Sequence, residues 1–118
     1  MAKTTARQPE PRLIVAEPIL TILVARDGDE YTAYCPELDI AAAMETPDEA
    51  VKVVLALMRE YAEDYLADLE AYARSPNRAH HLPYVRRIAA CRDEWQLRQL
   101  VAVKYGDIGE IFERLRRD

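Results

Sequence analysis

The chain has 118 residues, of which half are hydrophobic and three are glycine, an ordinary composition for one small globular domain with a modest core. The formal net charge of -5 and the pI near 5.1 argue against nucleic-acid binding by the whole surface, which needs a basic footprint. Residues 1–83 hold 8 Lys and Arg against 15 Asp and Glu, a balance of -7, whereas residues 84–118 hold 8 against 6, a balance of +2. The acidic part could therefore favour a basic partner.

The N-terminal residues 1–12 contain no hydrophobic stretch of the kind found in secretory signals, and we expect them to form a disordered tail. No apolar run in the sequence is long enough to span a membrane. The two cysteines, Cys35 and Cys91, lack CxxC spacing and are typical of reduced cytosolic thiols. These features predict a cytoplasmic protein that does not contact a membrane.

Three strands are predicted in the first half of the chain. Residues 18–27 are rich in Ile, Leu and Val on both alternating faces, so we expect both faces of the sheet to be at least partly covered. The Asp-Gly pair within residues 27–30 indicates a hairpin in which both turn positions would have positive φ. Residues 31–35 would form the antiparallel return strand, ended by Pro36. Residues 39–45 alternate as a third strand, although their alanines would also suit a helix.

A long helix is predicted to follow. Thr46 can cap it, Pro47 suits its first position and Glu49 completes a capping box. Apolar residues at helical spacing continue to about residue 73, and the helix would then be roughly 39 Å long and overhang strands of about 20 Å. Its second half needs a cover, which either the remaining chain or a second copy of the protein must supply. The residues expected to mediate self-association are Tyr65, Leu66, Leu69 and Tyr72.

The rest of the chain is expected to be mainly helical. Residues 82–92 can form a helix, with a strand across residues 85–89 as the alternative. Residues 93–103 and residues 107–117 would form two further helices, each opened by an aspartate cap and separated by a turn at Gly106.

Together these elements predict an α+β fold, in which a small antiparallel sheet of three or four strands packs on one long helix and carries a helical C-terminal extension. We divide the chain into the tail at residues 1–12, a sheet-helix core at residues 13–75 and the extension at residues 76–118. The extension is expected to pack on the core within a single domain.

The residue types that could carry chemistry do not form a catalytic pattern. Cys35 lies near Glu37, whose charge would raise the pKa of the thiol, so we interpret Cys35 as a small buried hydrophobic residue and not as a nucleophile. His80 and His81 are adjacent and would diverge on a helix or a strand, and nothing has metal-ligand spacing. A glycine-rich phosphate loop, a Ser-His-Asp pattern and an HExxH motif are absent. We expect no catalytic residue, no metal site and no cofactor, and hence no enzyme.

The order of the predicted elements resembles the HicB-like antitoxin family. Its members characteristically read as an apolar strand, a turn, the motif Y-x-A-x-x-P-E-L and a D-T-x-E-E-A helix start. The resemblance covers roughly residues 18–62, and the matching positions are Ile19 to Val24, Tyr31, Ala33, Cys35, Pro36, Glu37, Leu38, Thr46, Glu49 and Ala50. It implies a small sheet packed on one helix, similar to a truncated ribonuclease-H-like or double-stranded-RNA-binding-like fold. It also implies a protein that neutralises a small basic RNA-cleaving toxin of the HicA type, often as a dimer or higher oligomer.

The predicted function is thus non-catalytic binding of a small basic protein, and the acidic residues that we assign to this contact are Glu37, Asp39 and Glu45. One alternative is a free-standing HicB-like protein of unrelated role. Another is a DNA-binding autorepressor, because many family members carry a C-terminal DNA-binding part and residues 93–117 have the outline of a helix-turn-helix. Its basic residues lie at the far end of the second helix, whereas base-reading residues usually lie near its start. They are Arg114, Arg116 and Arg117.

Overall fold

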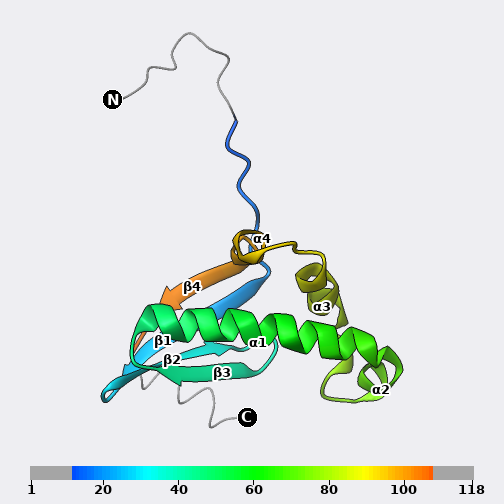
Figure 1. The fold of residues 1–118 in the computed structure, drawn as a ribbon, viewed down its shortest axis with the longest axis horizontal. Coiled ribbons are helices and arrows are strands. Elements are labelled where there is room, and N and C mark those ends of the chain that lie inside the picture. Colours follow the sequence, from blue (N-terminus) through cyan, green and yellow to red (C-terminus); the bar gives the residue numbers. More distant parts are fainter. Residues whose placement is uncertain (1–11, 108–118) are drawn as a thin grey trace.

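The structure is a computed structural model that describes residues 12–107, which form a four-stranded sheet covered by a long helix (Figure 1). The strand order is β3-β2-β1-β4, where the strands are β1 (Leu20–Asp27), β2 (Glu30–Cys35), β3 (Ile40–Met44) and β4 (Val101–Tyr105). The first three strands pair antiparallel, but β4 runs parallel to β1. The predicted α+β class is confirmed, with the difference that the sheet is mixed.

The hairpin between β1 and β2 lies at the predicted place but has a different turn. Asp27 pairs with Glu30, so the two turn residues are Gly28 and Asp29. Gly28 has a φ of +62°, and Asp29 is not among the described residues with positive φ. Glycine alone at the first central position is the pattern of a type II′ turn, not of the type I′ turn that the Asp-Gly pair predicts.

The connection between β2 and β3 is a tight turn that starts at Pro36. Asp39 adopts a φ of +57° there, a left-handed conformation that aspartate tolerates better than most side chains. Leu38, next to it, is buried in the core. β3 then begins at Ile40, as its alternating pattern predicts.

Helix α1 (Pro47–Ala67) begins as the sequence predicts. The N–H of Glu49 donates to the hydroxyl of Thr46 at 3.1 Å, and Pro47 occupies the start of the first turn. The helix packs its apolar stripe on β1, β2 and β3 and extends beyond the sheet (Figure 1). The stripe consists of Ala50, Val51, Val54, Leu55, Met58, Ala62 and Tyr65, all of them buried.

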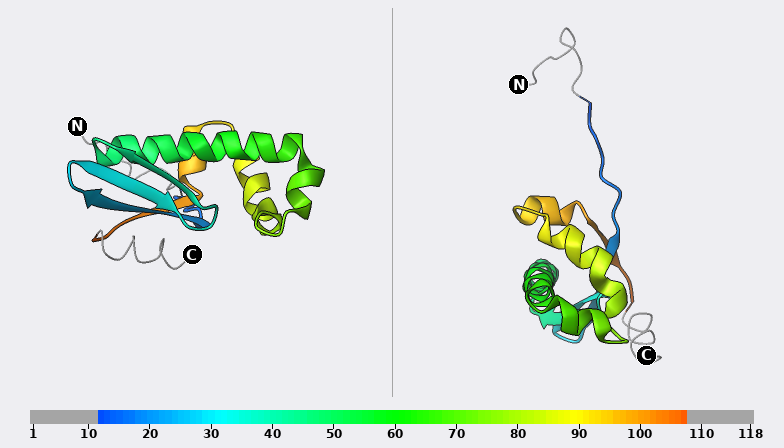
Figure 2. Two further views of the ribbon diagram at one scale, coloured as in Figure 1. Left: turned by 90° about the horizontal axis from the view of Figure 1, so that it is seen from below. Right: turned by 90° about the vertical axis from the view of Figure 1, so that its right-hand side faces the viewer.

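The helical stretch predicted to reach residue 73 is interrupted at Asp68. This residue has φ -135° and ψ 55°, outside the helical region, and α2 (Leu69–Arg74) starts after it. Figure 2 shows α2 turned away from the axis of α1, and its chain returns through the short helix η1 (Ala79–His81). The apolar spacing continues in phase across the break, so periodicity could not reveal it.

Of the two alternatives for residues 82–92, the helix is correct, since α3 spans Leu82–Ala89. Helix α4 (Glu94–Arg98) follows, with the predicted cap at Asp93, whose carboxylate accepts from the N–H of Gln96 at 2.9 Å. The helix predicted for residues 93–103 is wrong beyond α4, because residues 101–105 form β4. Pairing of this valine-rich segment with β1 overrides its local helical pattern. The helix predicted for residues 107–117 lies outside the described residues, apart from Asp107.

The core lies between the sheet and α1, where the aliphatic residues of β1 meet the helix stripe. Helix α3 adds Val85 and Ile88, and α4 adds Leu97. On the opposite face of the sheet, Ala25, Thr32 and Tyr34 are also buried, as expected for a sheet partly covered on both faces. Within residues 12–107, no helix has both the length and the apolar character that a membrane span requires.

Candidate partner-binding surfaces

A run of acidic residues occupies the first half of the described chain. Between Arg26 and Lys52 the sequence contains no Lys or Arg. It contains eight carboxylates there: Asp27, Asp29, Glu30, Glu37, Asp39, Glu45, Asp48 and Glu49. The net charge of residues 1–83 averages this run with the basic residues on either side of it. The uninterrupted run of carboxylates could therefore have been recognised from the sequence.

The fold gathers six of these carboxylates at one end of the sheet, which we call the acidic end. Because Tyr31 pairs with Met44, the β1–β2 turn and the β3–α1 junction lie at the same end. The guanidinium of Arg26 lies over the Tyr31 ring there, 5.7 Å from its centroid. All six carboxylate residues are exposed, and they are Asp27, Asp29, Glu30, Glu45, Asp48 and Glu49.

The three acidic residues predicted to bind a partner are not brought together. Glu45 belongs to the acidic end, whereas Asp39 is exposed at the opposite end of β3. Glu37 is half-buried, and its carboxylate accepts from both the N–H and the hydroxyl of Thr21, each at 2.9 Å. Glu37 therefore ties the β2–β3 turn to β1, and this contact occupies both of its oxygens.

The thiol of Cys35 is enclosed in the core beside Glu37. It donates to a carboxylate oxygen of Glu37 at 3.6 Å and is fully buried. Burial, joined by the charge of Glu37, raises the pKa of the thiol to about 12. A thiol with this pKa is protonated at neutral pH, so the arrangement does not supply a nucleophile.

A tyrosine cluster joins the overhanging half of α1 to the chain that follows it. We use this name for Tyr61, Tyr65 and Tyr72 together with Arg78. The rings of Tyr65 and Tyr72 stack with centroids 4.8 Å apart, and the hydroxyl of Tyr65 donates to the carbonyl of Arg78 at 2.8 Å. The Arg78 guanidinium lies 5.6 Å from the Tyr61 ring and 5.5 Å from the Tyr72 ring. The remaining chain thus supplies the cover that the overhang requires.

The residues predicted for self-association all take part in this packing. Tyr65 is fully buried inside the chain. Leu66, Leu69 and Tyr72 are half-buried and pack against the core. Contact of these side chains with a second copy stays a prediction.

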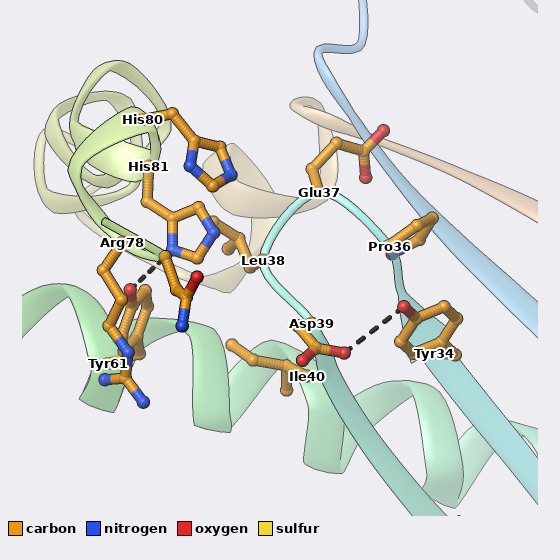
Figure 3. Close-up of a pocket in the computed structure, with 11 residues that line it drawn as sticks. Tyr34, Pro36, Glu37, Leu38, Asp39, Ile40, Tyr61, Arg78, His80 and His81 are labelled. Atoms are coloured by element: carbon orange, nitrogen blue, oxygen red, sulfur yellow. Dashed lines mark hydrogen bonds between the residues drawn. The ribbon is translucent and has the colours of Figure 1, made fainter. Parts of the chain in front are cut away.

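An open cavity of about 660 Å³ separates the β2–β3 turn from η1 (Figure 3). On its η1 side, Nδ1 of His81 lies 2.6 Å from the hydroxyl of Tyr61. Burial lowers the pKa of His81, and the neighbouring His80 and Arg78 lower it further against an opposing effect of Asp39. In a neutral His81 whose Nδ1 carries no proton, Nδ1 accepts a hydrogen bond from the hydroxyl of Tyr61. Among residues 12–107 no group of three or more His, Cys, Asp or Glu could hold a metal ion.

The predicted DNA-binding outline is wrong in its first half. The segment before Gly106 is β4, not the end of a helix, because residues 101–105 pair with β1. Arg114, Arg116 and Arg117 lie outside the described residues.

Comparison with family models gives a match over residues 19–103 to the PHD-like family, described as antitoxin of toxin-antitoxin, RelE/RelB, TA system. The match covers most of the chain, from the start of the sheet to β4. The chain belongs to this antitoxin family. Comparison with curated protein sequences gives no match. Membership in an antitoxin family fits the expectation that the protein is not an enzyme.

A solved structure shares the fold of this antitoxin. It comes from Syntrophomonas wolfei subsp. wolfei and is described as an antitoxin part of a proposed toxin/antitoxin system. The two superpose with a TM-score of 0.67 at 17% sequence identity, over 74% of this chain and 63% of the other. The chain therefore spans less than two thirds of that protein, and the likeness at this identity is one of fold.

Proposed function

We propose that this antitoxin neutralises a small basic RNA-cleaving toxin of the HicA type by direct protein–protein binding. The observation that carries the proposal is the acidic end, where six exposed carboxylates from two separate loops meet. A surface of one charge sign steers an oppositely charged partner and raises its association rate. Of the predicted contact residues, Glu45 belongs to the acidic end, whereas Asp39 lies at the opposite end of β3 and accepts a hydrogen bond from the hydroxyl of Tyr34 at 3.3 Å. Glu37 supports the β2–β3 turn.

The assignment to the HicB-like group is part of this proposal. It is supported by the order of β1, a hairpin, β2 ending at Cys35, the β2–β3 turn, β3 and the Thr46-capped start of α1. The family description favours a second candidate, a toxin of the RelE type. Nothing in residues 12–107 favours the DNA-binding alternative.

Co-expression with each candidate toxin encoded in the same genome tests the proposal. Rescue of growth and isolation of a complex with a HicA-type protein would support it, and rescue from a RelE-type protein alone would favour the second candidate. If neither protein forms a complex, the neutralising function is wrong.

A charge-reversal set then tests the surface. The triple variant Asp29→Lys, Glu30→Lys, Glu45→Lys changes three exposed side chains of the acidic end. The matched control Glu60→Lys, Glu63→Lys, Glu70→Lys makes the same charge change along α1 and α2. We expect the first set to lower the association rate constant by about tenfold or more, with strong salt dependence, and the control to have a much smaller effect. Equal rates for the two sets would exclude the acidic end as the binding surface.

A further inference from the structure

An apolar arm projects from the start of the sheet. Residues 12–18, which we call the arm, run in extended conformation away from the rest of the described chain (Figure 1). Leu13, Ile14 and Val15 are exposed to 88%, 87% and 73%. Three consecutive aliphatic side chains are exposed to water here, and burying them would lower the free energy.

A second exposed apolar feature lies at the β4 edge of the sheet. β4 is the outermost strand in the order β3-β2-β1-β4, so its outer edge has no strand neighbour among the described residues. The register with β1 places Val103 and Tyr105 on the same face as the core residues Ile22 and Val24. Because α1 packs on the other three strands, Val103 and Tyr105 remain 38% and 72% exposed. The β4 edge thus offers both backbone groups and apolar side chains.

We propose that the arm of one copy adds as an antiparallel strand to the β4 edge of a second copy. With Leu13 opposite Tyr105 and Val15 opposite Val103, both aliphatic residues share a face with the exposed side chains of β4, because directly opposed residues point to the same side. Ile14 then lies opposite Lys104 on the other face. In this register Arg12 lies opposite Gly106, just beyond the end of β4.

The occupant of the β4 edge is a second copy and not the same chain. The arm leaves the sheet at Ile19, whose N–H donates to the carbonyl of Leu100 just before β4. To reach its own β4 edge the arm would have to reverse direction at this point. Pro18 restricts the preceding Glu17 to extended conformations, which opposes such a reversal.

Sedimentation velocity of the full chain at micromolar concentration tests self-association. We expect a dimer for the wild type and a monomer for the variant Leu13→Ser, Ile14→Ser, Val15→Ser. These side chains are exposed in the single chain, so the variant should still fold, which a circular dichroism spectrum and cooperative thermal unfolding can verify. The control Ala41→Ser, Ala43→Ser changes exposed residues of β3, the opposite edge strand, and should remain dimeric.

Disulfide cross-linking tests the register. In a Cys91→Ser background, the pair Leu13→Cys and Tyr105→Cys should give a covalent dimer on oxidation, and the pair Leu13→Cys and Lys104→Cys should not, since Lys104 lies on the other face. A monomeric wild type would overturn the proposal, as would equal cross-linking of both pairs. A dimer that survives the arm variant would also overturn it and would point to Leu66, Leu69 and Tyr72 instead. The toxin is not involved in any of these measurements, so their outcome is independent of the neutralising function.

Discussion

The two halves of α1 are held by different interactions. The N-terminal half lies on the sheet, where Val54 and Met58 are fully buried among aliphatic side chains. The C-terminal half lies beyond the sheet, where α3 packs against it and contributes Val85 and Ile88 to the core. The tyrosine cluster and His81 add ring contacts there, and the hydroxyls of Tyr61 and Tyr65 are hydrogen-bonded. The difference shows how a helix longer than its sheet can be stabilised by a smaller aliphatic contact together with aromatic stacking and hydrogen bonds. Dispersion and the hydrophobic effect act on both halves, and directional contacts are concentrated in the second.

The aliphatic half should be the more sensitive to loss of volume. Met58→Ala removes a fully buried side chain at the sheet interface, and we expect the free energy of unfolding to fall by about 2–5 kcal/mol. Urea denaturation followed by circular dichroism measures it. Lys52→Ala on the exposed side of the same helix is the control and should change the free energy by less than about 0.5 kcal/mol. A similar loss for both variants would contradict the assigned core.

The tyrosine half should be sensitive to loss of a single polar atom. Tyr65→Phe keeps the ring stack but removes the hydrogen bond to the carbonyl of Arg78, and we expect a loss of about 1–3 kcal/mol in the free energy of unfolding. The control Tyr84→Phe removes a hydroxyl for which the structure shows no hydrogen bond in the described part of the chain, and it should be close to neutral. If Tyr65→Phe leaves the free energy of unfolding unchanged, the hydrogen bond to the carbonyl of Arg78 is no more favourable than the hydrogen bonds to water that replace it.

A smaller effect on the free energy of unfolding should come from pH, and it should arise in the C-terminal half of α1, where His81 lies. The pKa of His81 is lowered in the folded state, so the unfolded state binds more protons and stability rises with pH in this range. The His81 contribution is fully present above the unfolded pKa of about 6.5 and is lost as pH falls through the lowered folded pKa. Urea titrations between about pH 5 and about pH 7.5 should show this dependence in the wild type and in His80→Asn, but less of it in His81→Asn. If the free energy of unfolding depends on pH with the same slope in the two variants, His81 is not the source of the pH dependence.

The smallest expected effect concerns the thiols and leaves stability unchanged. With a pKa of about 12, only roughly one Cys35 thiol in ten thousand is ionised at about pH 8, and the group is also buried. Cys91 is half-buried and its pKa is raised as well, again chiefly by burial. Iodoacetamide should therefore label Cys91 slowly and Cys35 only after unfolding, as mass spectrometry can measure. Labelling of Cys35 in a native Cys91→Ser variant would show that the sheet opens locally.

The elements predicted correctly are those whose signals are local. Gly28 in the hairpin, Thr46 at the helix cap and Asp93 at the α4 cap each act through neighbours a few residues away. β4 could not be predicted in this way, because its strand conformation depends on pairing with β1 far away in the sequence. The break at Asp68 accompanies the stacking of Tyr72 on Tyr65, and the apolar spacing does not distinguish this arrangement from a continuous helix.

The same distinction applies to the candidate surfaces. Glu45 could be recognised as an exposed acidic residue, but its proximity to Glu30 depends on the register of β2 with β3. Glu37 was predicted to bind a partner, yet Thr21 engages it, a contact that joins residues on two different elements. The apolar arm is readable as a hydrophobic tripeptide, but only the fold shows that it remains uncovered.

The parallel pairing of β4 with β1 has a consequence for synthesis of the chain on the ribosome. β1, its hairpin with β2 and α1 can form as soon as they leave the exit tunnel, but the outer neighbour of β1 follows about eighty residues later. At roughly 5–20 residues per second, the edge of β1 stays open for about 4–16 seconds in each nascent chain. During that time an aliphatic strand offers its free backbone groups to any extended segment nearby, so neighbouring ribosomes on one message would be the setting in which this protein is most exposed to mispairing.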